Sequence, residues 1–276
     1  MEAVTNFLRY PGSKRRQLTF LSNYLPVRDM IENQYIEPFL GGGAVFFYVN
    51  PKSAILSDIN LELIELYRGI RRDPNGVWNH YSGFGHNKNE YHRIRDEVKG
   101  GDLSLRAARI LYLNRTCFKG MWRYNSQGKF NVGYGGEERR WVINLDNLKE
   151  VSAVLQQADI QCEDFGTIIQ KSGKGDFIFV DPPYRPGEFE QKNDHYAWKT
   201  FTYEDNKRLA QALSSASKRG VQWALSISSH LKILDLYKDN WAVEFPMVTG
   251  RRPGIMTRQS GEVLIMNYEN EGTIQL

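Results

Sequence analysis

YIEPFLGGGAVFFYV, residues 35–49, joins a short apolar run to a three-glycine turn and then to a helical pattern. A strand, a glycine turn and a helix in this order begin a βαβ unit, which is typical of parallel sheets. The same alternation continues along the chain. We predict strands at 35–39, 53–57, 160–162, 177–180, 221–227, 241–248 and 262–268, and helices at 44–49, 60–71, 103–113 and 203–218. The sequence therefore predicts an α/β protein built on one twisted sheet with helices on both faces.

The helix at 203–218 has the clearest predicted ends. Thr202 and Asp205 have the spacing of a capping box, in which the two residues satisfy each other's backbone N–H groups. Gly220 follows the last turn, where glycine commonly ends a helix. These local signals predict the position of this helix independently of any tertiary contact.

Residues 72–148 differ from the rest of the chain in composition, because they are polar, aromatic and rich in glycine, with one clear helix predicted around 103–113. Sheet-like runs return only after them. We therefore predict two units: a sheet domain formed by 1–71 and 149–276, and a mostly helical module at 72–148 inserted between the second and third strands.

Composition narrows the class of protein. The 276 residues carry a net charge of +4, which permits a nucleic-acid partner without requiring one. Cys117 and Cys162 are the only cysteines, so neither a disulfide framework nor a metal site is expected, and a reducing compartment is the default. The amino terminus lacks the pattern of a secretory signal, and no apolar run approaches membrane-spanning length.

The glycine turn at 41–43 lies where α/β sheets bind nucleotide-like ligands, because glycines let the backbone approach the ligand closely. Asp58 ends the second predicted strand, where an acid can accept both ribose hydroxyls. A nicotinamide dinucleotide or S-adenosylmethionine suits this arrangement. Phe46 stands where the dinucleotide fingerprint needs its third glycine, which favours S-adenosylmethionine. A plain tight turn is the alternative for the glycines taken alone.

Asp181-Pro182-Pro183-Tyr184 follows the apolar strand at 177–180. The prolines cannot donate to a sheet ladder, so the strand ends there in stiff, extended backbone with unpaired carbonyl oxygens. Asp181 adds a carboxylate acceptor and Tyr184 adds a flat ring. The group can therefore hold a planar heterocycle with an exocyclic amine, such as adenine or cytosine. A strand-ending turn with an Asp cap is the alternative for the first three residues.

Positive charge is concentrated inside the predicted module, between residues 106 and 140. This stretch contains eight basic residues and only two acidic ones, and six aromatic residues are interleaved with them. The basic residues are Arg106, Arg109, Arg115, Lys119, Arg123, Lys129, Arg139 and Arg140. Such a set is typical of a surface that follows phosphates and stacks on bases. For any one of these residues, a solvated face over a small core is the alternative.

Four motifs together resemble the Dam-type DNA adenine-N6 methyltransferases. They are Phe39–Gly43, Asp58–Asn60 and Asp181–Tyr184, in that order, together with the early segment Phe7–Lys14. Residues 111–115, 123–125 and 128–132 resemble the DNA-recognition module that this family carries between its cofactor motif and its DPPY motif. The resemblance covers nearly the whole chain and implies a Rossmann-like methyltransferase sheet for the domain of 1–71 and 149–276.

The resemblance also implies roles for individual residues. S-adenosylmethionine would be bound by Tyr10, Lys14, Phe39, Gly41, Gly43, Asp58 and Asp181. The target base would be held by Asp181, Pro182, Pro183 and Tyr184. Arg9 and Arg123 match positions that contact base edges, and Phe118 and Met121 match positions that wedge into the duplex near the flipped base. The remaining expected DNA contacts are Arg115, Lys119, Asn131, Arg139 and Arg140.

By this resemblance, the function expected is site-specific methylation of adenine in a short duplex target, such as a GATC-like site. Methylation of RNA or of a protein amide is the nearest alternative, and a DNA-binding regulator without catalysis is the alternative from another class. We expect a monomer that acts on double-stranded DNA and has no membrane partner. Its expected location is the nucleoid, in the cytoplasm of a bacterium or a phage-infected cell. A cognate restriction nuclease is a further candidate partner.

Overall fold

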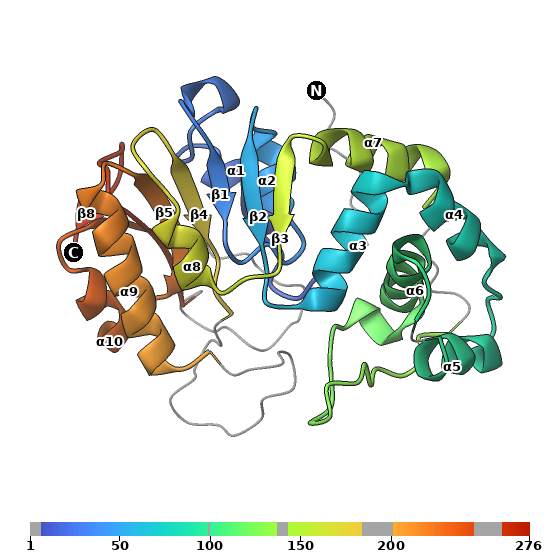
Figure 1. Ribbon diagram of the computed structural model, residues 1–276. Coiled ribbons are helices and arrows are strands. Elements are labelled where there is room, and N and C mark those ends of the chain that lie inside the picture. Colours follow the sequence, from blue (N-terminus) through green and yellow to red (C-terminus); the bar gives the residue numbers. More distant parts are fainter. Residues whose placement is uncertain (1–6, 99, 137–142, 184–200, 246–260) are drawn as a thin grey trace.

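The computed structural model describes residues 7–98, 100–136, 143–183, 201–245 and 261–276. In this described part of the chain, eight strands form one sheet in the order β3-β2-β1-β4-β5-β7-β6-β8 (Figure 1). The strands are β1 Tyr35–Glu37, β2 Ala54–Ser57, β3 Ala158–Gln161, β4 Phe177–Val180, β5 Gln222–Ser228, β6 Trp241–Glu244, β7 Glu262–Met266 and β8 Ile274–Gln275.

The first five strands in space, β3-β2-β1-β4-β5, run parallel, whereas β7, β6 and β8 continue the sheet by antiparallel pairing. Ile36 in β1 is in register with Ile55 in β2 and Ile178 in β4. The carboxyl ends of these three strands therefore meet at one edge of the sheet. In open α/β sheets, that edge is where ligands bind.

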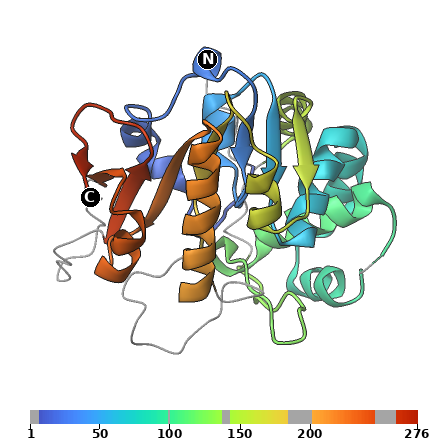
Figure 2. The same cartoon turned by 60° about the vertical axis from the view of Figure 1, so that its left-hand side comes forward.

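Helices cover both faces of the sheet, as predicted. On one face lie α8 Phe165–Gln170, α9 Tyr203–Lys218 and α10 Leu231–Leu234, followed by η5 Asp235–Tyr237. On the other lie η1 Lys14–Gln17, α1 Leu18–Leu21, α2 Ala44–Val49 and α3 Leu61–Arg72. Figure 2 shows α8 and α9 in front of the sheet. A short η2 spans Arg28–Met30.

Alternation along the strands produces two buried clusters. Phe177 and Phe179 in β4 point into the cluster with α1, α2 and α3, while Ile178 and Val180 point into the cluster with α8 and α9. Because both faces of this strand are buried, every side chain in it must be apolar, and residues 177–180 therefore form a continuous apolar run.

Residues 72–148 add α4 Pro74–Gly83, α5 Lys88–Asp96 and α6 Leu103–Thr116, which lie together beyond α3 in Figure 1. The central helix is α6, which packs against α3, α4 and α5. Gly69 in α3 faces Ala107 in α6, and a methyl group added to Gly69 would overlap with the Ala107 methyl. The two helices therefore cross at very short range, and the core of the inserted residues is continuous with that of the sheet.

After α6, the chain forms η3 Phe118–Gly120 and a small hairpin with antiparallel bridges at Cys117–Tyr134 and Tyr124–Phe130. We refer to residues 117–134 as the hairpin. Of α4, α5 and α6, the sequence predicted only α6, which extends to Thr116 rather than ending at 113. The next helix, α7 Leu145–Leu155, runs across the domain boundary predicted at 148.

Candidate functional site at the carboxyl edge of the sheet

The glycine turn after β1 is held from two sides. Asp58, after β2, accepts the Gly41 N–H at 3.0 Å with one carboxylate oxygen and the Asn60 N–H at 3.0 Å with the other. The Tyr67 hydroxyl donates to the Gly41 carbonyl at 3.0 Å. Gly41 and Gly43 have φ values of +47° and +63°, which glycine adopts at little cost. The turn is therefore fixed before any ligand arrives.

Tyr10 lies directly against this turn. A methyl group added to Gly41 would stand 2.9 Å from the Tyr10 ring, so only glycine allows the approach. The same ring packs on Trp122 of the hairpin with centroids 5.5 Å apart. Burial, followed by the Asp58 carboxylate, holds the pKa of the Tyr10 phenol well above its usual value. Tyr10 thus connects the glycine turn to the insertion.

An aromatic wall stands beside the turn. The Phe39 ring stacks on Phe165 at a centroid distance of 5.2 Å and meets Phe201 edge-on at 5.6 Å. Phe39 follows β1, Phe165 begins α8 after β3, and Phe201 lies just before α9, so three separate segments form the wall. Phe165 is buried, whereas Phe39 and Phe201 are half-buried, so the wall has an apolar accessible side that suits one face of a planar ligand.

Asp181, at the end of β4, is paired with Lys14. The Lys14 ammonium lies 2.7 Å from the Asp181 carboxylate and 3.0 Å from that of Glu262, and its side chain is only 5% exposed. Burial raises the pKa of Asp181 to about 6, although Lys14 opposes the shift; Glu262 adds a smaller increase. Asp181 therefore changes charge closer to neutral pH than an exposed aspartate does.

Glu262 is a site residue that the sequence did not reveal. Besides Lys14, its carboxylate accepts the Ser226 hydroxyl at 2.6 Å and the Gln17 side-chain amide at 3.2 Å. Nothing distinguishes Glu262 in the sequence from any acid at the start of an apolar strand. Only the fold places Glu262 at the site, because β7 lies between β5 and β6 in the sheet.

The prolines after Asp181 differ in exposure, since Pro182 is buried and Pro183 is exposed. Tyr184 lies outside the described residues, as do Arg139 and Arg140. The predicted roles of these three residues remain predictions.

Arg9 lies beside the insertion. Its backbone N–H donates to the Asn114 side chain at 3.0 Å, and the Asn114 amide donates to the Arg9 carbonyl at 2.7 Å. Gly120 packs so closely against the Arg9 side chain that an added methyl group would overlap with it. The early segment Phe7–Tyr10 is therefore bound to α6 and the hairpin together.

The hairpin brings several expected DNA contacts to one region. Phe118 is 43% exposed, and the Lys119 ammonium lies 5.3 Å from its ring centre. Lys119 has a φ of +56°, which is uncommon for a residue with a side chain and is often found at functional sites. Met121 follows and is half-buried.

Arg123 and Asn131 face each other across the hairpin. The Arg123 guanidinium donates to the Asn131 side-chain oxygen at 2.9 Å and to its carbonyl at 3.1 Å. Both side chains are half-buried, so the guanidinium is held in place while part of it remains accessible.

Two of the eight basic residues counted in the sequence are buried in α6, which corrects the expected surface charge. Arg109 pairs with Glu62 at 2.9 Å. Arg115 is 2% exposed, and burial lowers its pKa to about 10. The reason is that α6 is the central helix of the insertion and is covered on several sides. Burial argues against a direct DNA contact by Arg115.

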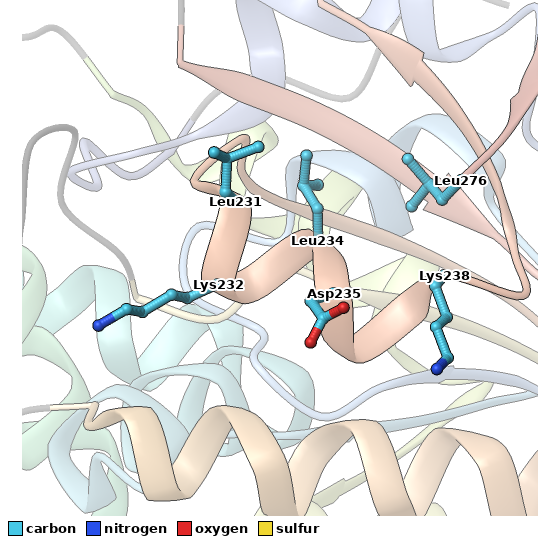
Figure 3. A pocket seen from close by; sticks show the side chains of 6 residues that line it. All are labelled: Leu231, Lys232, Leu234, Asp235, Lys238 and Leu276. Carbon is cyan, nitrogen blue, oxygen red and sulfur yellow. The ribbon is translucent and has the colours of Figure 1, made fainter.

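A shallow depression elsewhere on the surface contains none of the predicted site residues. It is lined by Leu231, Lys232, Leu234, Asp235, Lys238 and Leu276, and the three leucines gather on one side of it (Figure 3).

Among the described helices, none combines the length and apolarity needed to cross a membrane.

Known proteins resemble this chain over most of its length. The family model described as D12 class N6 adenine-specific DNA methyltransferase matches residues 10–251. The Type II methyltransferase M1.LlaDCHI of Lactococcus lactis subsp. cremoris is 31% identical over 96% of this chain and 95% of its own. The Type II methyltransferase M.MjaIII of Methanocaldococcus jannaschii is 31% identical over 96% and 99%. A DNA N-6-adenine-methyltransferase of Escherichia phage P1 is 32% identical over 87% of this chain but only 32% of its own.

Proposed function

Because the chain belongs to the D12 class of N6 adenine-specific DNA methyltransferases, we propose that it transfers a methyl group from S-adenosylmethionine to the exocyclic amine of adenine in duplex DNA. The observation that carries the proposal is the position of Asp181. It lies at the end of β4, next to the β1 strand whose glycine turn is expected to hold the cofactor, and its pKa is raised to about 6 by burial. Perturbed carboxylates of this kind cluster at functional sites.

The residues at the sheet edge suit S-adenosylmethionine. Gly41 and Gly43 leave the backbone open to close approach, and the wall around Phe39 offers an apolar face for the adenine ring. The two Asp58 oxygens accept the backbone N–H groups of Gly41 and Asn60, and their remaining lone pairs can accept ribose hydroxyls. Tyr10 and Lys14 complete the expected contacts. When bound, the cofactor supplies an electrophilic methyl group on a sulfonium.

The amine of adenine is a weak nucleophile, because its lone pair is conjugated with the ring. The Asp181 carboxylate and the Pro182 carbonyl would accept its two N–H groups and so direct the lone pair toward the methyl donor. This is positioning together with electrostatic complementarity to developing positive charge. A base inside a duplex cannot reach Asp181, so the target must be flipped out, and stacking on Tyr184 would offset part of that cost.

Target recognition is assigned to the hairpin and the segment beside it. Arg9 and Arg123 would contact base edges, Phe118 and Met121 would enter the space left by the flipped base, and Asn131 would hold Arg123 in place. Lys119, Arg139 and Arg140 would meet phosphates. A short GATC-like target, a monomeric enzyme and action at the nucleoid of a bacterial or phage-infected cell belong to this proposal. A cognate restriction nuclease is included because type II relatives occur.

Turnover is expected to fall below a pH of about 6, by about tenfold per pH unit, because Asp181 must be ionised to accept the amine. A raised pKa means that the carboxylate takes up its proton at higher pH than an exposed aspartate. The measurement is the single-turnover rate against pH with both substrates saturating. Glu262→Gln removes a charge that raises the pKa of Asp181. The acid limb of the pH–rate profile, which is the fall in rate at low pH, should therefore move to lower pH.

The matched control for that pH experiment is Glu244→Gln. Glu244 is an exposed acid on β6, the strand that pairs with β7, and its change should leave the acid limb where it is. An acid limb that stays fixed or rises in Glu262→Gln would contradict the arrangement around Asp181.

The function itself is tested by expressing the chain in a host that lacks adenine methylation and mapping modified bases by sequencing. We expect N6-methyladenine at every copy of one short motif. Methylcytosine, or a methylated RNA with unmodified DNA, would replace the proposal by another methyltransferase activity. An unmodified genome, with no transfer of labelled methyl groups by the purified protein, would overturn it.

A further inference from the structure

The phenol of Tyr124 lies where the hairpin meets the first turn of α3. We propose that its hydroxyl is a positioning group that holds the Asp58–Asn60 loop in its cofactor-binding shape, so that cofactor affinity depends on the hairpin. The inference rests on the proposed function, because it assumes that the glycine turn and Asp58 bind S-adenosylmethionine.

The side chains of Trp122, Glu62 and Asn60 lie around the Tyr124 oxygen. The Trp122 indole N–H donates to it at 2.9 Å, the Glu62 carboxylate lies at 2.8 Å, and the Asn60 side-chain amide lies at 3.3 Å. Burial, followed by the Glu62 charge, holds the pKa of the phenol well above its usual value, so it has one proton to donate. Glu62 is the closer acceptor and takes that proton. The Asn60 amide therefore donates to Tyr124.

From Asn60, a chain of hydrogen bonds leads to the glycine turn. The Asn60 side-chain oxygen caps α3 by accepting the Leu63 N–H at 3.3 Å, and both this oxygen and the amide nitrogen lie 3.3 Å from the Tyr124 oxygen. The Asn60 backbone N–H donates to Asp58, whose second oxygen accepts the Gly41 N–H. A change at Tyr124 thus reaches Asp58 through one residue.

The other end of the network is anchored inside the insertion. Glu62 accepts Arg109 at 2.9 Å, and the same guanidinium donates to the carbonyls of Ile94 at 3.2 Å and Arg95 at 3.0 Å, at the end of α5. Glu62 therefore joins α3, α5, α6 and the hairpin. Because Arg109 remains bound to it, Glu62 keeps a partner when the Tyr124 hydroxyl is removed.

The hydroxyl can be removed without disturbing the packing of the ring. Tyr124 meets Phe130 edge-on at a centroid distance of 5.9 Å, and a phenylalanine makes the same contact. Tyr124→Phe therefore isolates the hydrogen bonds from the hydrophobic contacts of the hairpin.

The test is the affinity of Tyr124→Phe for S-adenosylhomocysteine, measured by calorimetry on the full chain without DNA. We expect about tenfold weaker binding, and a similar rise in KM for S-adenosylmethionine with little change in kcat. Tyr134→Phe is the matched control, because its hydroxyl donates to the His86 carbonyl at 2.8 Å in the same hairpin but does not reach the sheet edge. Its cofactor affinity should equal that of the wild type.

Equal affinity in Tyr124→Phe and the wild type overturns the inference, and so does equal weakening in both tyrosine variants. If Tyr124→Phe does not fold, Glu62→Gln decides the matter, because it weakens the same hydrogen bond from the other side and should raise the same KM. A wild-type protein that binds no cofactor at all would instead contradict the proposed function.

Discussion

Asp181→Ala is expected to lower the rate of methyl transfer by about a thousandfold or more, while the protein stays folded and still binds the cofactor. The alanine cannot accept the adenine amine, so the nucleophile is neither oriented nor stabilised as charge develops. The fold should persist because Lys14 keeps its ion pair with Glu262. The measurement is single-turnover transfer of a labelled methyl group, with cofactor affinity determined in parallel.

The control for this variant lies at the other end of the same strand. Asp176, just before β4, accepts the Gln34 N–H at 3.1 Å and the Gly173 N–H at 2.7 Å. Asp176→Asn should lower thermal stability and leave the transfer rate nearly unchanged. Near-normal turnover in Asp181→Ala would remove Asp181 from the reaction.

Arg123→Ala is expected to relax discrimination at one base pair of the target by about 1–3 kcal/mol. Arginine reads guanine through two parallel hydrogen bonds, and Asn131 already fixes the plane of this guanidinium in the protein alone. The measurement is the ratio of kcat/KM on the cognate duplex to that on duplexes with single substitutions.

Lys129→Ala provides the comparison, since Lys129 is an exposed cation on the same hairpin. We expect it to weaken binding to all sequences alike and to reduce the salt dependence by about one counterion. If Arg123→Ala also loses the same amount on cognate and scrambled duplexes, Arg123 contacts the backbone and reads no base.

The sequence predicted the sheet well where local signals were strong. β4 and α9 have the predicted bounds, and the Thr202–Asp205 capping box is present. Apolar runs, glycine turns and helix caps depend on only a few neighbouring residues, so the elements they mark can be predicted without knowledge of the fold. The short helices α4 and α5 were missed because their residues are mostly polar and aromatic, and their apolar faces are narrow.

Other features depend on contacts between distant segments and could not be predicted. Gln17 and Glu262 are bonded although they lie 245 residues apart in sequence. Arg115 looks like a surface cation in the sequence, and only the packing around α6 shows that it is buried. Charge in a sequence does not reveal whether a side chain faces solvent, so the surface charge of the insertion could not be predicted from its sequence alone.

The close crossing of α3 and α6 at Gly69 has a consequence for exchanging target specificity between relatives. A transplanted segment of 72–148 brings its own residue to position 107, and any side chain larger than alanine there would push against α3. The helix would tilt, and the attached loop would present its side chains to the wrong part of the groove. A chimera should therefore take α3 and α6 from the same donor.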